Sequence, residues 1–246
     1  MEVSVMQWNV WFKQDIDEVV DFLKANPADI ICLQELTRGY VEQTRENTWE
    51  FIAHAIGYEV HVQEIPIITP DAQWSQANAI FSKFPILSKV AGWIHEPEDP
   101  ESLTDQYRGY LEIDVDTGSG PLTIATTHMS FRPHGEPEGD LELQQLLTHT
   151  KDREHYVMTG DLNVTPEHYR IAELLKHLRN AGPDFTEYTW PTKPFEHDGI
   201  ILGGTPDRRL DYILASKDVK VKGSGLLQTD ISDHLPAFVT VELVTA

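Results

Sequence analysis

The short apolar segment ADIICLQE, residues 28–35, constrains the fold of this chain more than any other. A continuous apolar run of this length, without alternating polar residues, is typical of a strand buried on both faces in a layered α/β protein. The run ends on a carboxylate, Glu35, and follows Pro27, which ends the preceding helix. We therefore expect a layered sheet with helices packed against it and Glu35 at the end of one strand.

Four segments carry the signals of amphipathic helices. The best marked has apolar residues at helical spacing after the capping residue Asp15, with Glu18 three residues later. Thr165 and Pro166 are residue types preferred at the N-cap and first position of a helix. We predict helices over 16–25, over 49–56 with Gly57 as its stop, over 139–150, and from Pro166 to beyond Leu175.

The remaining apolar segments are short and are predicted to be strands. A Gly-Ser-Gly turn at 118–120 joins two of them in a hairpin. The segment from about 180 to 208 is rich in Pro and Gly, so we expect a long loop, and such loops are often functional. No repeat or linker divides the chain, which predicts a single domain over residues 1–246. The predicted strands are 3–10, 28–35, 58–65, 77–82, 86–94, 108–116, 121–131, 156–163, 210–215 and 236–244.

The balance of charge limits the partners of the chain. Its 19 Lys and Arg against 40 Asp and Glu give a formal net charge of −21. Nucleic-acid binding draws on basic contacts to phosphates, so this charge disfavours extensive non-specific binding of nucleic acid. The single cysteine, Cys32, lies in the apolar run 28–35, so no intrachain disulfide forms and a buried, unreactive thiol is expected.

The sequence also indicates a location. No apolar run approaches the roughly 20 residues that a membrane-spanning helix needs. The first residues, MEVSVMQWNVW, lack the basic and apolar regions of a signal peptide. We therefore expect a cytoplasmic protein, and we expect it to be a monomer.

Polar side chains suited to metal binding and proton transfer lie at or just beyond the ends of the predicted strands. Each one alone is explained equally well as a turn or capping residue, since Asp and Asn suit turns. Strand ends of a layered α/β core meet at one rim, however, so we expect these residues to form one site. They are Asn9, Glu35, His128, Asp161, Asn163, Asp211, Asp233 and His234.

Such a site would bring four carboxylates together, and a cation is needed among them. Two like charges about 4 Å apart repel by roughly 4 kcal/mol at an effective dielectric near 20. The chain has one cysteine and no histidine pair with zinc-finger spacing, which favours an oxygen-liganded hard cation, Mg²⁺ or as a substitute Mn²⁺. Mg²⁺ keeps several waters and can engage a phosphate oxygen, so the pattern indicates phosphoryl chemistry.

An ordered set of motifs connects the chain to a known family. It contains, in order, QWNVW, LQEL, THMSF, GDLNVTP, RRLDYIL and SDHLP, and so resembles the endonuclease/exonuclease/phosphatase superfamily of metal-dependent phosphohydrolases over nearly its whole length. The resemblance implies a four-layered α/β sandwich of two packed, mostly antiparallel sheets flanked by helices. Trp11 stands where apurinic-site endonucleases carry an acid or amide, so the chain looks closer to the branch of sphingomyelinase-like phosphodiesterases, deadenylases and tyrosyl-DNA phosphodiesterases.

The resemblance also implies roles for the candidate residues around the metal and the attacking water. Glu35 would be the principal Mg²⁺ ligand, Asp233 would support the metal through its water shell, and Asn9 would contact metal-bound water or phosphate. Asp161 would orient and deprotonate the attacking water. Asn163 would donate a hydrogen bond to this water or to the phosphate.

The same resemblance implies a group of residues on the phosphate. His234 would stabilise the phosphoryl oxygens and act as a general acid, and Asp211 would hold its imidazole in the right tautomer. His128 resembles a histidine that several branches of the superfamily place on the phosphate. Arg108, in YRGYLEI, is our candidate for neutralising charge in the transition state.

The expected function is Mg²⁺-dependent hydrolysis of a phosphate ester by in-line attack of water. A nucleic-acid end-processing endonuclease or exonuclease is the alternative within the same chemistry, and a non-catalytic binding module on the same fold is the alternative outside it. Three tryptophans, Trp74, Trp93 and Trp190, are able to stack on a base or a lipid headgroup, although packing within the protein is the commoner use of such rings. The sequence leaves the physiological substrate and the number of metal ions open.

Overall fold

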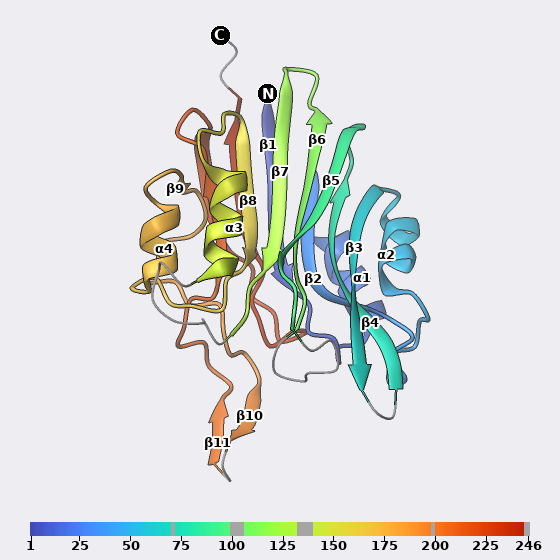
Figure 1. Ribbon diagram of the computed structural model, residues 1–246. Helices are drawn as coiled ribbons and strands as arrows, with labels where there is room; N and C mark the ends of the chain where they lie inside the picture. Colours follow the sequence, from blue (N-terminus) through green and yellow to red (C-terminus); the bar gives the residue numbers. More distant parts are fainter. Residues whose placement is uncertain (70–71, 99–105, 132–139, 198–199, 244–246) are drawn as a thin grey trace.

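A computed structural model of the chain describes residues 1–69, 72–98, 106–131, 140–197 and 200–243. Two six-stranded sheets form its centre (Figure 1). Neighbouring strands of the first sheet follow the order β13-β14-β1-β2-β4-β3, and those of the second follow β5-β6-β7-β8-β12-β9. Only β1 with β2 and β7 with β8 pair in parallel among the described strands, so the prediction of mostly antiparallel sheets is confirmed.

The strands have the following bounds. The first sheet contains β1 (Glu2–Asn9), β2 (Ile30–Arg38), β3 (Glu59–Thr69), β4 (Ala72–Ser82), β13 (Lys220–Leu226) and β14 (Ala237–Glu242). The second contains β5 (Ile86–His95), β6 (Arg108–Asp116), β7 (Pro121–His128), β8 (Tyr156–Asp161), β9 (Arg179–Asn180) and β12 (Asp211–Ala215). A separate hairpin is formed by β10 (Pro194–His197) and β11 (Ile200–Gly203).

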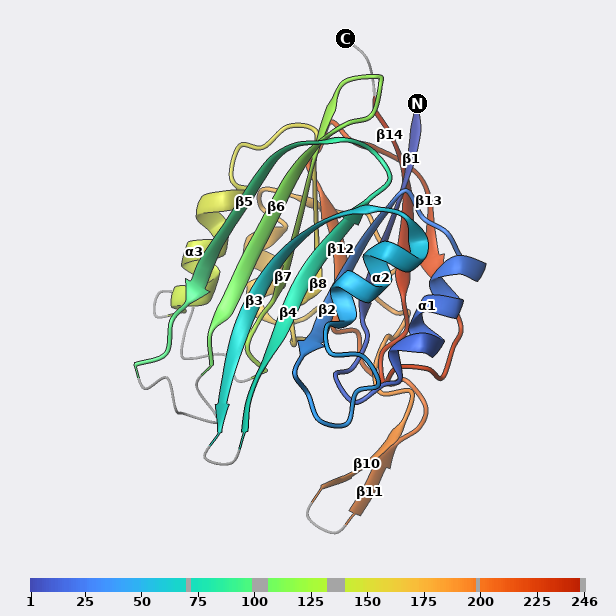
Figure 2. The ribbon, with the colours of Figure 1, turned by 90° about the vertical axis from the view of Figure 1, so that its right-hand side faces the viewer.

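Helices cover the outer face of each sheet, which confirms the predicted four layers. Figures 1 and 2 show α1 (Ile16–Ala25) and α2 (Thr48–Ile56) outside the first sheet, and α3 (Leu141–Thr150) and α4 (Tyr169–Leu174) outside the second. Three buried apolar clusters separate the layers: one lies between the two sheets, and one lies between each sheet and its helices. No helix in the described ranges is long and apolar enough to cross a membrane.

The inner faces of the central strands change from apolar to polar along their length. In β1 the side chains that face the other sheet are Val3 and Val5, followed by Gln7 and Asn9, because alternate residues of a strand share a face. The same change occurs in β2, β7 and β8, where buried apolar residues are followed by Gln34, by Thr126 and His128, and by Thr159 and Asp161. This pattern places a polar layer at one end of the otherwise apolar interior between the two sheets.

The predicted start of the fourth helix is wrong, β3 and β4 are longer than predicted, and strands β9, β10, β11 and β13 were not predicted. Strand β2 runs to Arg38, so Glu35 lies within it at an irregularity and not at its end. Helix α4 begins at Tyr169 with His168 as its cap, because residues 165–168 form a turn closed by the His168 N–H donating to the Thr165 carbonyl at 3.0 Å. The expected loop at 180–208 contains the β10–β11 hairpin. Strand β13, KVKGSGL, is mostly exposed and has no apolar alternation that would have revealed it. Residue 139, where the third helix was predicted to begin, lies outside the described residues.

Candidate active site

The predicted site residues lie together at the end of the sandwich opposite the two chain termini (Figure 1). A pocket of about 690 Å³ opens there between the ends of the two sheets. Asn9 and Asp211 are buried behind the pocket, where they contact residues of its wall. The other candidates line it: Glu35, Arg108, His128, Asp161, Asn163, Asp233 and His234.

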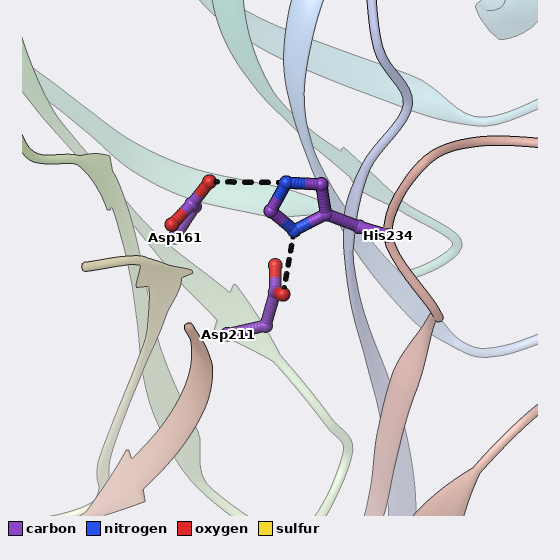
Figure 3. A group of neighbouring side chains, drawn as sticks. All are labelled: Asp161, Asp211 and His234. Atoms are coloured by element: carbon purple, nitrogen blue, oxygen red, sulfur yellow. Dashed lines mark hydrogen bonds and ion pairs between the residues drawn. The ribbon is translucent and has the colours of Figure 1, made fainter. Parts of the chain in front are cut away.

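One imidazole lies between two buried carboxylates (Figure 3). His234 donates from Nδ1 to Oδ2 of Asp211 at 2.8 Å, while its Nε2 faces Oδ2 of Asp161 at 3.7 Å. Burial opposes the charge on His234, but Asp211 and Asp161 outweigh it and raise the pKa of the imidazole. Burial also raises the pKa of Asp161, against the attraction of His234. The arrangement favours a protonated imidazole aimed at the pocket.

The Asn9 amide connects the carboxylate of Glu35, on the first sheet, with that of Asp161, on the second. Its Nδ2 donates to Oε1 of Glu35 at 2.9 Å and to Oδ2 of Asp161 at 3.0 Å, and its Oδ1 accepts from the Trp11 N–H at 3.0 Å. The donors and the acceptor of this amide therefore have protein partners. In this arrangement Asn9 holds the two carboxylates in place.

Glu35 is held in an unusual backbone conformation at a bulge in β2. Its φ is 62°, a left-handed value that costs energy for a residue with a side chain, and Trp11 and Asn163 share this feature at φ 59° and 54°. Oε2 of Glu35 accepts from the Phe12 N–H at 3.1 Å. The surrounding structure thus enforces a position that aims this carboxylate at the pocket.

The charges around Glu35 fit a bound cation. Burial first and the nearby Asp233 second raise the pKa of Glu35, so the folded chain disfavours both carboxylates being ionised together. Within the described parts of the chain, no lysine or arginine forms an ion pair with either residue. Hard oxygen donors that lack a cation are the ligand set that Mg²⁺ or Mn²⁺ prefers.

One group of three ionisable side chains in the described part of the chain is compact enough for an ion. One ligand atom from each of Asp161, Asp211 and His234 lies within 4.8 Å of the others. However, Nδ1 of His234 is already bonded to Asp211, and a protonated imidazole supplies the positive charge that these two carboxylates need. The geometry therefore favours the Glu35 and Asp233 side of the pocket for a metal ion.

His128 and Asn163 form a pair on the second sheet's side. Burial, with the cations Arg108 and His234 nearby, holds the pKa of His128 well below its usual value, so its ring is neutral at pH 7. Its Nε2 accepts from Nδ2 of Asn163 at 3.0 Å, and the same Nδ2 donates to the Met129 carbonyl at 2.9 Å. Asn163 thus orients His128, and its own donors are used.

Arg108 is a cation buried in the wall of the pocket. It is 8% exposed, and its Nε has no hydrogen-bond partner among the described residues. Burial lowers the pKa of the guanidinium, while Glu142, Glu35 and Asp161 act in the opposite direction. A buried N–H without a partner is costly, and Arg108 lines the pocket, so its guanidinium is a candidate partner for an anionic oxygen bound there.

Several residues that support the site were not predicted. The Ser232 hydroxyl donates to the Asn9 carbonyl at 2.7 Å, and the indole N–H of Trp8 donates to the His234 carbonyl at 2.9 Å. These hydrogen bonds fix the SDH loop, residues 232–234, on β1. Trp190 Nε1 donates to Oδ2 of Asp233 at 3.2 Å. Serine and tryptophan carry no signal of such a role in the sequence, although Trp8 and Ser232 lie within motifs.

A polar belt beneath the site was also not predicted. Gln34 donates to Oε1 of Gln7 at 3.0 Å and to the Thr126 hydroxyl at 2.9 Å, and the Thr159 hydroxyl donates to that of Thr126 at 3.0 Å. Gln7 in turn donates to Oδ1 of Asp211 at 3.3 Å. The belt satisfies the hydrogen-bonding groups that are buried between the sheets, and through Gln7 it supports the Asp211 carboxylate from below.

Comparison with known proteins agrees with this fold. The sequence pattern described as the Endonuclease/Exonuclease/phosphatase family matches residues 6–234. A comparison with curated protein sequences found no match. An endonuclease/exonuclease/phosphatase from Beutenbergia cavernae DSM 12333 superposes with a TM-score of 0.72 at 19% identity, covering 98% of this chain and 72% of that one.

Two other similar structures have more specific descriptions. A mannosyl-6-phosphatase of Bacteroides thetaiotaomicron VPI-5482 superposes with a TM-score of 0.66 at 16% identity, covering 98% of this chain and all (100%) of that one. TDP2 of D. rerio, complexed with a single-strand DNA product, gives 0.65 at 17% identity, covering 98% and 99%. At these identities the similarity establishes the fold alone.

Two sheets packed face to face, helices outside and acids with imidazoles at one rim define a phosphoesterase fold of the α/β sandwich kind. Because the family pattern spans nearly the whole sequence, the chain belongs to the endonuclease/exonuclease/phosphatase family. Members of this family are hydrolases, and they generally use a divalent metal ion.

Proposed function

We propose that this chain is a single catalytic domain that hydrolyses a phosphate ester with the help of Mg²⁺, for which Mn²⁺ can substitute. The observation that carries the proposal is that Glu35, Asp161, His234 and Arg108 line one pocket. Together they offer a metal-binding carboxylate, a base and two cations for a phosphoryl group. Uncatalysed hydrolysis of phosphate esters is extremely slow, so charge neutralisation and a positioned base are both needed.

Glu35 and Asp233 would hold the cation, and Asn9 would fix the Glu35 carboxylate through its hydrogen bond to Oε1. When bound, the cation would neutralise charge on a phosphoryl oxygen and orient the phosphate. The indole of Trp190 would hold the Asp233 carboxylate in place by its hydrogen bond to Oδ2. These two hydrogen bonds support the metal-binding roles that we propose for Glu35 and Asp233.

Asp161 would take a proton from the attacking water. Its raised pKa, caused by burial, makes it a better base than an exposed aspartate, and Asn9 and the Asn163 N–H orient its two oxygens at 3.0 and 2.9 Å. The water oxygen forms a bond to phosphorus while the bond from phosphorus to the leaving oxygen breaks. The products are an alcohol and the phosphate with one ester bond fewer.

The cations of the pocket would stabilise the transition state. His234, kept protonated and oriented by Asp211, would donate from Nε2 to a phosphoryl oxygen, and it can also protonate the leaving oxygen. Arg108, whose side chain lines the pocket, would place its guanidinium on a second oxygen. His128, held by Asn163, would bind the phosphate as a neutral ring.

A small ester is favoured over a polynucleotide as substrate. The net charge of −21 opposes a strand of phosphates outside the pocket. The proteins with a similar fold include both a mannosyl-6-phosphatase and a TDP2 complexed with a single-strand DNA product, so nucleic-acid end processing stays as the second candidate. The cytoplasmic location and the monomeric state expected from the sequence stay predictions.

The test is a set of hydrolysis assays with Mg²⁺. The substrates are p-nitrophenyl phosphate, bis-p-nitrophenyl phosphate, single-stranded oligonucleotides and phospholipid vesicles, and the proteins are wild type, Asp161→Asn, and Asp21→Asn on the exposed face of α1 as the control. We expect turnover of a small ester, a loss of about 100-fold or more in Asp161→Asn, and no change in the control. Cleavage of oligonucleotides alone would favour the second candidate.

The non-catalytic alternative makes a different prediction in the same assays. A pure binding module turns over none of these esters, and its ligand binding is unchanged by Glu35→Ala and His234→Ala. Either result would contradict the proposed reaction.

A further inference from the structure

We propose that the ester group of the substrate carries a flat aromatic ring, and that this ring packs against a wall of the pocket formed by Phe12 and Trp74. The inference rests on the proposed function, because it assumes that a phosphate ester binds at the pocket. It goes further by naming the chemistry of the group attached to the phosphate.

The wall is made of aromatic rings that the chain leaves partly exposed. Phe12 and Trp74 stack with ring centroids 5.5 Å apart and an angle of 30°, and both line the pocket. Tyr40 packs against the two rings, at 5.3 Å from Phe12 and 4.7 Å from Trp74, and braces them. Phe12 and Trp74 are partly exposed, and aromatic side chains that are partly exposed in a pocket favour flat apolar ligands, since stacking adds to the burial of apolar area.

This wall is physically connected to the reaction centre. Phe12 donates its backbone N–H to the Glu35 carboxylate at 3.1 Å, while its ring lines the same pocket. A phosphate bound at Glu35, Asp161 and His234 therefore presents any ester group that turns toward the first sheet to Phe12 and Trp74. The position of Phe12 therefore determines both the orientation of Glu35, the proposed metal ligand, and the aromatic surface beside it.

Trp190, another aromatic residue that lines the pocket, is engaged by contacts within the protein. Trp190 donates its indole N–H to Asp233, and the Arg208 guanidinium lies over its ring at 5.0 Å from the centroid. Trp190 thus serves the site by contacts within the protein. Of the two tryptophans that line the pocket, Trp74 therefore offers the better surface for the substrate.

Negative charge in the hollow beyond Trp74 opposes a polynucleotide substrate that would continue in that direction. A second hollow of about 610 Å³ shares Ile67 and Trp74 with the pocket, and its charged lining residues are Arg38, Glu46 and Glu64. Arg38 is paired with Glu64 at 3.2 Å, which leaves the hollow with an excess of negative charge. A further phosphate on this side would be repelled, so the ring is expected to end the substrate there.

Binding of non-hydrolysable phosphonates tests the inference without turnover. Phenylphosphonate and methylphosphonate are titrated calorimetrically into wild type, Trp74→Ala and Trp93→Ala in the presence of Mg²⁺. Trp93 is the matched control, because it is also a partly buried tryptophan on a strand with an aromatic neighbour, Tyr107 at 4.9 Å, but it does not line the pocket. Phe12→Leu, which keeps the backbone N–H to Glu35, is the second variant if Trp74→Ala does not fold.

We expect wild type and Trp93→Ala to bind phenylphosphonate about 10-fold more tightly than methylphosphonate, and the ratio to fall toward one in Trp74→Ala or Phe12→Leu. Adenosine 5′-monophosphate and a dinucleotide distinguish the source of the ring: the mononucleotide should bind at least as well as the dinucleotide. Equal binding of the two phosphonates by wild type, an unchanged ratio in the variants, or tighter binding of the dinucleotide would each overturn the inference. If neither phosphonate binds and no ester is hydrolysed, the proposed function fails as well.

Discussion

Oδ2 of Asp211 lies 2.8 Å from Nδ1 of His234, and both side chains are buried although the residues come from different segments, β12 and the SDH loop. The hydrogen bond fixes the tautomer of the imidazole and leaves Nε2 to face Asp161 and the pocket. An acid, an imidazole and a second acid in this order are the arrangement by which a protein keeps one histidine protonated and directed.

Replacing the first acid should change the pH dependence of catalysis. In Asp211→Asn the carboxylate that raises the pKa of His234 is lost, so the imidazole gives up its proton at lower pH. We expect kcat/KM to fall by about 100-fold at pH 8, and the alkaline decline in activity to begin at lower pH than in wild type. Identical pH profiles for the two proteins would contradict the assigned role of His234.

The same pair predicts a direction for stability. Because the pKa of His234 is raised in the folded chain, its contribution is fully present below the ordinary value of 6.5 and is lost as the pH rises through the folded value. Urea unfolding between pH 6 and 10 should therefore show a loss of stability in wild type that is smaller in Asp211→Asn.

Much of the fold was predictable because local signals and tertiary burial agree. Helix α1 begins after Asp15, whose side chain accepts from the Asp17 N–H, and helix α2 stops at Gly57 with φ 73°. The start of α4 was not predictable from Thr165 and Pro166, since the turn at 165–168 depends on contacts made in the folded chain. Edge strand β13 has little apolar surface, so its formation depends on pairing with β14.

Gly160 is required by the close approach of β8 to β7. A Cβ at this position would lie 2.4 Å from the Thr127 carbonyl oxygen, a backbone atom that cannot move aside alone. We expect Gly160→Ala to lower the free energy of unfolding by about 3 kcal/mol in urea denaturation. Gly92→Ala, which meets nothing within 4 Å, should change it by less than about 0.5 kcal/mol. Equal effects would show that the strands separate easily at Gly160.

A buried ion pair behind the site should make stability fall in acid. Burial opposes the charge of Asp140, but hydrogen bonds from Arg170 and Tyr169 hold its pKa below the usual 3.8. Its contribution is therefore present above pH 3.8 and is lost as the pH falls through the lower, folded value.

Asp140→Asn keeps the cap of α3 but leaves Arg170, which is 0% exposed, without its main partner. We expect a loss of about 3 kcal/mol at pH 7 that shrinks toward pH 2, measured by thermal unfolding across this range. Asp17→Asn, which breaks an exposed pair with Arg45, is the control and should change little. A pH-independent difference would contradict the assigned pKa.

Cys32 should be unreactive in the native chain. Burial raises the pKa of its thiol to about 12, partly opposed by a hydrogen bond from Thr159. At pH 8 we expect no reaction with dithionitrobenzoate until guanidinium unfolds the protein, and then one thiol per chain. Rapid reaction without denaturant would mean that the space between the sheets opens.

The candidate site was only partly predictable. Residues such as Glu35 and His234 carry chemistry that is visible in a motif, and strand ends gave a reason to bring them together. Gln34 and Ser232 are ordinary polar residues in a sequence, and their importance comes from what they contact once buried. The pocket wall at Trp74 was not predictable either, because whether a tryptophan packs inside or lines a cavity depends on the surrounding strands.

The most direct test of the account is calorimetric titration of Mg²⁺ and Mn²⁺ into wild type, Glu35→Gln and Glu50→Gln. Glu50 is an exposed glutamate of α2 paired with Arg38, and serves as the control. We predict that wild type and Glu50→Gln bind the ions equally, and that Glu35→Gln binds them at least about 10-fold more weakly with a matching loss of ester hydrolysis. Binding of the ions that is unchanged by Glu35→Gln, or absent from wild type, would contradict the claim that these acidic residues hold a divalent cation for phosphoryl chemistry.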